Sequence, residues 1–243
     1  MFRHIILGFV LVCSAAFEAD YGPHHGLVSA LLAHLPYGVP PQPINVSLGL
    51  TVLHLDKVDF VKNSISFSGW LSMEWQDSRL AWDPSLYGDI VQVHISARNL
   101  WMPDIALYTG VTTDGAGPVF ACPPEQSGEA IVKYMGEISY YPKIRIESHC
   151  QFSLQADGEP ESNQRCSVKL GSWTFAVDDV DLHFNPSDDP LKYLQPHRCW
   201  EIERAVSERG FYNLYQADYA YLTYTFDLKL AEFGGREKYC RHH

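Results

Sequence analysis

Hydrophobic residues recur at every second position through most of this chain, a period typical of β-strands that bury one face. The alternation holds over residues 46–52, 65–75, 90–95 and 222–230. An earlier stretch, residues 26–35, instead repeats its leucines at helical spacing and is followed by a proline. We therefore expect an all-β protein, an immunoglobulin-like β-sandwich of about ten strands with an N-terminal α-helix.

Three further segments refine this expectation. Residues 130–141 predict a hairpin that turns near Met135 and Gly136. Pro103 excludes a fully paired central strand around it, so residues 99–108 are predicted to be an edge strand or a loop. Residues 178–196 are acidic and contain prolines, and we expect a long loop there.

Aromatic residues occupy the polar side of three predicted strands. Trp70 lies among serines, Trp173 shares a face with Lys169 and Gly171, and Tyr219 lies on the outward face of the last strand. Any one of these rings can simply cover a contact between subunits or domains, and this interpretation has the same weight as a ligand-binding role. Rings that meet can instead bind an ammonium group, at about 0.5–2 kcal/mol for each contact.

Composition and charge narrow the function. The 243 residues carry a formal net charge of −11, which argues against nucleic acid as a partner and favours cationic ligands. The sequence has no zinc-ligand spacing, no Gly-x-Ser-x-Gly motif and no phosphate-binding glycine loop, so we expect neither an enzyme nor a metal or other cofactor. A divalent cation at Asp178, Asp179 and Asp181 is the minor alternative to a solvated acidic loop in residues 178–189.

The first residues have the pattern of a secretion signal. A basic Arg3 precedes the apolar run 5–12, and small residues follow at 14–16, so we expect a signal peptide over residues 1–19 and a secreted, extracellular domain over 20–243. The apolar run is too short to span a bilayer, and no later segment resembles a membrane span. Asn45 begins the one glycosylation sequon. Removal of the leader leaves an odd set of cysteines: Cys122, Cys150, Cys166, Cys199 and Cys240.

An ordered set of landmarks between residues 26 and 230 resembles the ligand-binding domain of the Cys-loop receptors, and above all the secreted acetylcholine-binding proteins. The set is a helix, Trp70-Leu-x-x-x-Trp75-x-Asp77-x-x-Leu80-x-Trp82, Trp101-x-Pro103-Asp104, two cysteines with fifteen residues between them, Gly171-Ser172-Trp173-Thr174, and Tyr219 in the last strand.

The resemblance implies a homo-pentamer that binds a small amine or cholinergic-like ligand in an aromatic cage between neighbouring subunits. It further implies a Cys150–Cys166 disulfide, and an Asp104 that braces the Trp173 segment, although a turn residue after proline explains Asp104 equally well. Phe211 and Tyr215 are rivals for the role given to Tyr212. The implied principal face is Tyr108, Trp173, Tyr212 and Tyr219, and the complementary face from the next subunit is Trp70, Ile131, Ser139 and Tyr141.

Two departures from the family pattern leave the ligand open. Residues 211–219 lack the adjacent cysteines that acetylcholine binders of the family carry, so a different amine is an alternative. The loop between Cys150 and Cys166 is longer than usual and polar, with Asp157-Gly-Glu-Pro160, which favours a secreted protein over a channel subunit. The extracellular part of a ligand-gated channel and a carbohydrate-binding sandwich remain the alternative functions.

Overall fold

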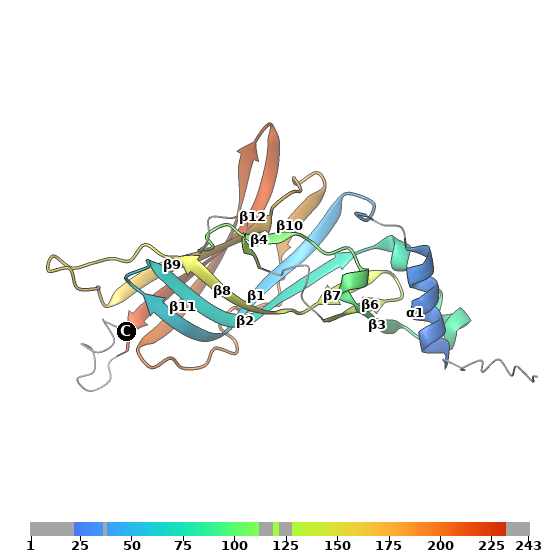
Figure 1. The fold of residues 1–243 in the computed structure, drawn as a ribbon, viewed down its shortest axis with the longest axis horizontal. Helices are drawn as coiled ribbons and strands as arrows, with labels where there is room; N and C mark the ends of the chain where they lie inside the picture. The colour runs from blue at the N-terminus through green and yellow to red at the C-terminus, as the bar shows by residue number, and fades with distance from the viewer. Residues whose placement is uncertain (1–21, 36–37, 112–118, 122–127, 232–243) are drawn as a thin grey trace, which may run out of the picture.

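Two β-sheets pack face to face, with one α-helix at an end of the sandwich (Figure 1). The computed structural model describes residues 22–35, 38–111, 119–121 and 128–231. The predicted signal peptide, Cys122 and Cys240 lie outside the described residues. The helix and the sheets confirm the fold class expected from the sequence.

The helix α1 (Gly22–His34) contributes Leu27 and Leu31, one turn apart, to the core. It contacts β3 and the short 3-10 helix η2 (Pro84–Tyr87). In Figure 1 it lies at the opposite end of the molecule from the loop between Cys150 and Cys166. Two more 3-10 turns, η1 (Ser78–Leu80) and η3 (Ala97–Asn99), lie before and after η2.

The first sheet has the long strands β1 and β2 at its centre. Its pairs are antiparallel except for β1 and β10, which run parallel. The order is β10 (Val180–Phe184), β1 (Ile44–Asp59), β2 (Ser64–Gln76), β7 (Glu137–Tyr140), β6 (Glu129–Lys133) and β3 (Gln92–Ser96), and β8 (Lys143–His149) also pairs with β2.

The second sheet is antiparallel and ends in a long hairpin, which projects from the body of the molecule in Figure 1. The hairpin consists of the first two strands of the sheet order, which is β11 (Trp200–Leu214), β12 (Ala217–Leu230), β9 (Asn163–Ser172), β4 (Ile105–Leu107) and β5 (Val119–Phe120).

The core lies between the two sheets, as the alternation predicted. Phe67 of β2 meets Phe226 of β12 with ring centroids 5.0 Å apart. The buried Tyr224 hydroxyl donates a hydrogen bond of 3.3 Å to the Leu48 carbonyl and so links the sheets directly. Trp75 is 4% exposed, whereas Trp70, five residues earlier in the same strand, points away from the core.

Two expectations about loops were wrong in part. The segment 178–196 contains β10, whose Val180 and Leu182 are buried against β1, while its charged residues point outward and hide the alternation. Pro103 does lie in a loop, but the strand that follows it, β4, is paired on both sides and is no edge. The described residues form twelve strands where about ten were expected, and the short strands β5 and β10 show no clear period in the sequence.

The described cysteines form disulfide bonds. Cys150 and Cys166 form a disulfide. Cys199 is disulfide-bonded as well. Asn45 lies exposed on β1, opposite Asp181 of β10. None of the described helices is long and apolar enough to cross a membrane.

Candidate functional site

Four aromatic side chains from four strands or strand ends gather on the outer face of the second sheet. Tyr108 follows β4, Trp173 follows β9, and Tyr212 and Tyr219 face each other across the β11–β12 hairpin. The ring centroid of Tyr108 lies 6.3 Å from that of Trp173 and 6.0 Å from that of Tyr212. Trp173 is 52% exposed, so its indole is available to a ligand.

Tyr108 lies flat against the sheet because Gly171 leaves room for it. A Cβ atom at Gly171 would come within 2.5 Å of the Tyr108 ring. The Tyr108 hydroxyl donates a hydrogen bond to the Ser172 carbonyl. Burial, followed by the charges of Asp104, Tyr212 and Tyr219, raises the pKa of Tyr108 to about 12. Tyr108 is therefore a neutral donor at physiological pH.

Asp104 fixes the backbone on both sides of Trp173. Its carboxylate accepts hydrogen bonds from the Ser172 hydroxyl at 2.6 Å and from the Thr174 amide at 2.7 Å. Its carbonyl accepts a third, from the Trp173 amide, at 3.2 Å. This geometry agrees with a bracing role for Asp104 and goes beyond what a simple turn residue requires.

The geometry separates Tyr212 from its two rivals. Phe211 points to the other face of the hairpin, where the Arg209 guanidinium lies 4.6 Å from its ring centroid. Tyr215 lies at the hairpin turn and is 99% exposed, with φ of 53°. Of the three side chains, Tyr212 has the ring that stacks near Tyr108.

Of the four residues predicted for the complementary face, Trp70, Ile131 and Ser139 lie on strands of the first sheet, and Tyr141 lies between β7 and β8 of that sheet. Ile131 and Ser139 are paired across β6 and β7, and Ser139 is also paired with Glu74 of β2. The Tyr141 hydroxyl donates to the Glu74 carboxylate at 3.2 Å, and burial raises the pKa of Tyr141. Within one protomer this group is therefore on a different sheet from Tyr108 and Trp173.

Sequence reasoning missed several side chains that shape these two faces. The Trp70 ring packs 5.5 Å from that of Tyr193, which lies between β10 and β11. Asp188 from the same segment accepts a hydrogen bond from Ser72 and fills the space over Gly49. No spacing in the sequence signals these contacts, because the segment reaches β1 and β2 only through the fold.

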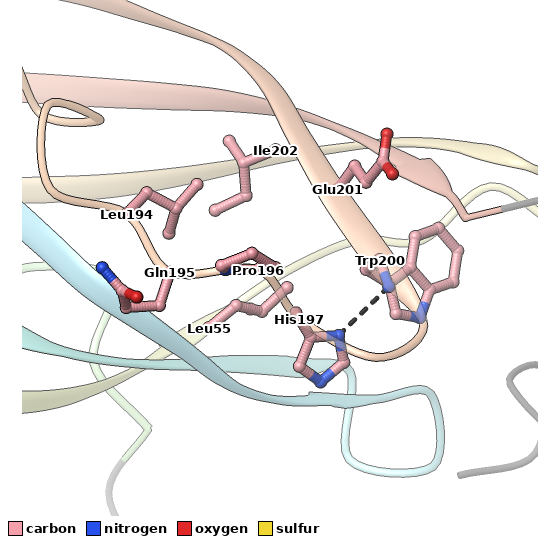
Figure 2. A pocket seen from close by; sticks show the side chains of 8 residues that line it. All are labelled: Leu55, Leu194, Gln195, Pro196, His197, Trp200, Glu201 and Ile202. Carbon is pink, nitrogen blue, oxygen red and sulfur yellow. Dashed lines mark hydrogen bonds between the residues drawn. The ribbon is translucent and has the colours of Figure 1, made fainter.

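A cavity of about 300 Å³ lies elsewhere, between β1 and the start of β11 (Figure 2). There the His197 ring nitrogen Nδ1 accepts hydrogen bonds from the Cys199 and Trp200 amides at 3.2 and 3.1 Å. Tyr212 is twelve residues further along β11 than Trp200, roughly 40 Å of strand, so this cavity is separate from the aromatic group. The described residues contain no cluster of His, Cys, Asp and Glu that could hold a metal ion.

Comparisons with known proteins show the family of the chain. The model of the family described as "Neurotransmitter-gated ion-channel ligand binding domain" matches residues 27–230. The chain is 32% identical over 209 residues to neuronal acetylcholine receptor subunit beta-3 of Gallus gallus, covering 82% of this chain and 44% of that protein. It is 30% identical over 213 residues to neuronal acetylcholine receptor subunit alpha-6 of Rattus norvegicus, covering 84% of this chain and 41% of the relative.

The chain thus spans less than half the length of these curated relatives. The match nevertheless covers both sheets and the helix residues from Leu27 onward. The resemblance inferred from the sequence is confirmed: the chain belongs to the family of neurotransmitter-gated ion-channel ligand-binding domains.

Proposed function

We propose that this protein binds a small ammonium ligand at each seam of a ring of five identical subunits. Tyr108, Trp173, Tyr212 and Tyr219 form the principal face of the seam, and the next subunit supplies Trp70, Ile131, Ser139 and Tyr141. The observation that carries the proposal is that the Tyr108 ring lies near both the exposed Trp173 indole and the Tyr212 ring, while Tyr219 is the strand partner of Tyr212. Their negative ring faces attract a cation, and each contact stabilises it by about 0.5–2 kcal/mol.

A ring explains why the two faces lie on different sheets. In a head-to-tail assembly, each subunit offers one surface to its neighbour and a different surface to the subunit behind. A single protomer then carries the principal half of one site and the complementary half of another. The negatively charged Glu74 and Asp188 beside the complementary residues add attraction for a cation.

The family consists of ligand-binding domains of ion channels and not of enzymes, so we propose reversible binding without chemistry. We favour a secreted protein, because residues 1–19 have the pattern of a signal peptide. The extracellular part of a channel subunit is the alternative favoured by the names of the relatives, which are acetylcholine receptor subunits. A longer transcript that encodes four apolar membrane spans after His243 would decide for the channel subunit.

The direct test is calorimetric titration of the assembled protein with choline. We expect Trp173→Ala to weaken binding about tenfold or more, because it removes the most exposed ring of the cage. Tyr134→Ala is the matched control, since Tyr134 is an exposed ring at the β6–β7 turn, outside the proposed site. Both variants should keep the pentamer in native mass spectrometry.

Equal affinity of the Trp173→Ala variant and the unmodified protein would refute the cage. Trp70→Ala should weaken binding from the other side of the seam. If glucose binds in the same calorimetric titration and choline does not, the carbohydrate-binding alternative replaces the proposal, because sugars also stack on exposed indoles.

A further inference from the structure

Lys169 places a positive charge inside the wall of the aromatic group. It lies on β9, in the row of outward residues that leads to Gly171 and Trp173. Its ammonium lies 4.2 Å from the ring centroid of Tyr221 and 4.8 Å from that of Tyr212, and it donates a hydrogen bond of 2.6 Å to the Tyr212 hydroxyl. A resident cation therefore already occupies part of the surface proposed to bind one.

No carboxylate in the described part of the chain neutralises this charge. No ion pair among the described residues includes Lys169, and its side chain is half-buried. An ammonium group has three N–H donors, and the Tyr212 hydroxyl takes one of them. The ring faces of Tyr212 and Tyr221 are the other contacts of this ammonium among the described residues.

The surrounding residues hold Lys169 in this position. Tyr221 lies flat over Gly210, where a Cβ atom would come within 2.5 Å of its ring. The Tyr212 and Tyr221 rings pack with centroids 4.5 Å apart. The ammonium is thus seated on a preorganised pair of rings.

A ligand that is only a cation is repelled by Lys169, whereas a ligand with a second, anionic group gains a charge-assisted hydrogen bond. The proposed complementary face offers carboxylates as well as a lysine: the Glu74 carboxylate is bound to Tyr141 and the Asp188 carboxylate to Ser72, while Lys192 lies over the Tyr193 ring that packs on Trp70. The seam of the proposed ring then brings the Lys169 ammonium of one subunit together with the Glu74 and Asp188 carboxylates of the next.

We infer that the ligand is a zwitterion with an ammonium and a carboxylate, and that Lys169 is the residue that binds the carboxylate. The inference rests on the proposed function and names its ligand class. The ammonium of the ligand lies among Trp173, Tyr219 and the complementary residues, and its carboxylate accepts hydrogen bonds from the Lys169 ammonium and the Tyr212 hydroxyl.

Glycine betaine and choline test this inference, because they share a trimethylammonium group and differ in that only betaine has a carboxylate. We expect the unmodified protein to bind betaine about tenfold or more tightly than choline in calorimetry at pH 7 and fixed ionic strength. Lys169→Gln should remove that preference by weakening betaine binding about tenfold or more, while choline binds as before or more tightly.

Two further variants separate recognition from a structural role. Thr223 lies directly opposite Lys169 on β12, so Thr223→Glu gives the ammonium an internal partner without removing it, and betaine should lose its advantage. Lys229→Gln removes one positive charge near the far end of the same strand and should change neither affinity. Lys169→Arg keeps the charge and should keep part of the preference.

The possible results are distinguishable. If choline binds at least as tightly as betaine, or if Lys169→Gln weakens both equally, the inference is wrong and Lys169 only positions Tyr212. If neither compound binds, or if Trp173→Ala leaves both affinities unchanged, the proposed function itself is wrong. A preference for betaine that depends on both Trp173 and Lys169 supports the two together.

Discussion

Gly171→Ala perturbs the contact on which the aromatic group is built. The added Cβ would lie 2.5 Å from Cζ, 2.6 Å from the hydroxyl oxygen and 2.8 Å from Cε2 of Tyr108. Non-bonded carbon atoms prefer about 3.5–4 Å, so the ring has to move outward by about 1 Å or more. The neighbouring backbone is held in the sheet by β4 and β12, so the ring moves rather than the strand.

The magnitude follows from what the displaced ring loses. Forcing an extra methyl into a packed contact costs about 1–3 kcal/mol. The Tyr108 hydrogen bond to the Ser172 carbonyl, worth about 0.5–1.5 kcal/mol, is broken as well. The reduced freedom of the unfolded chain offsets about 0.4–1 kcal/mol. We expect a net loss of about 2 kcal/mol in the free energy of unfolding.

Denaturant unfolding followed by tryptophan fluorescence measures this loss. Gly26→Ala is the matched control, because nothing lies within 4 Å of its added Cβ and the residue is in the exposed part of α1. That variant should be as stable as the parent or more stable by about 0.5–1 kcal/mol. A Gly171→Ala protein as stable as the Gly26→Ala protein would refute the proposed packing of the Tyr108 ring against Gly171.

Three other perturbations have defined outcomes. Asp104→Ala should cost about 2 kcal/mol in unfolding free energy by leaving two donors without their acceptor, and Asp104→Asn should cost less. Replacing Cys150 and Cys166 together by Ser should cost about 3 kcal/mol in the chain-entropy model, measured by thermal unfolding against the parent with its disulfide intact. Burial lowers the pKa of His197 below its usual 6.5, so the unfolded state binds more protons in that window; stability should fall as pH drops through 6.5 and below, and His197→Gln should remove this part of the pH dependence.

The faces of the strands were predictable because burial follows a period of two. Trp70 and Trp75 are five positions apart, an odd number, and the structure places them on opposite faces as expected. The Cys150–Cys166 pair followed from the family resemblance. Sequence reasoning placed Lys169 on the outward face of its strand but gave it no role, because a lysine on a polar face is ordinary until its neighbours are known.

What the sequence did not predict depends on contacts between distant segments. The strand β10 is recognisable only through its pairing with β1, since its outward residues are charged. Asp188 acquires a place over Gly49 because its segment folds back across the first sheet. Tyr221 shares the outward parity of Tyr219, yet its ring packs with Tyr212 and Lys169 only because Gly210 leaves space beside it.

Mixed rings test the central claim most directly, because they ask whether one site is built from two subunits. Trp70→Ala subunits keep an intact principal face, and Trp173→Ala subunits keep an intact complementary face. After the two variants are unfolded and refolded together in equal amounts, about a quarter of the seams in a head-to-tail ring combine both intact faces. The account predicts that calorimetry with choline or glycine betaine recovers about that fraction of full-affinity sites, although each variant alone binds weakly. Mixed rings that bind no better than the separate variants would contradict it.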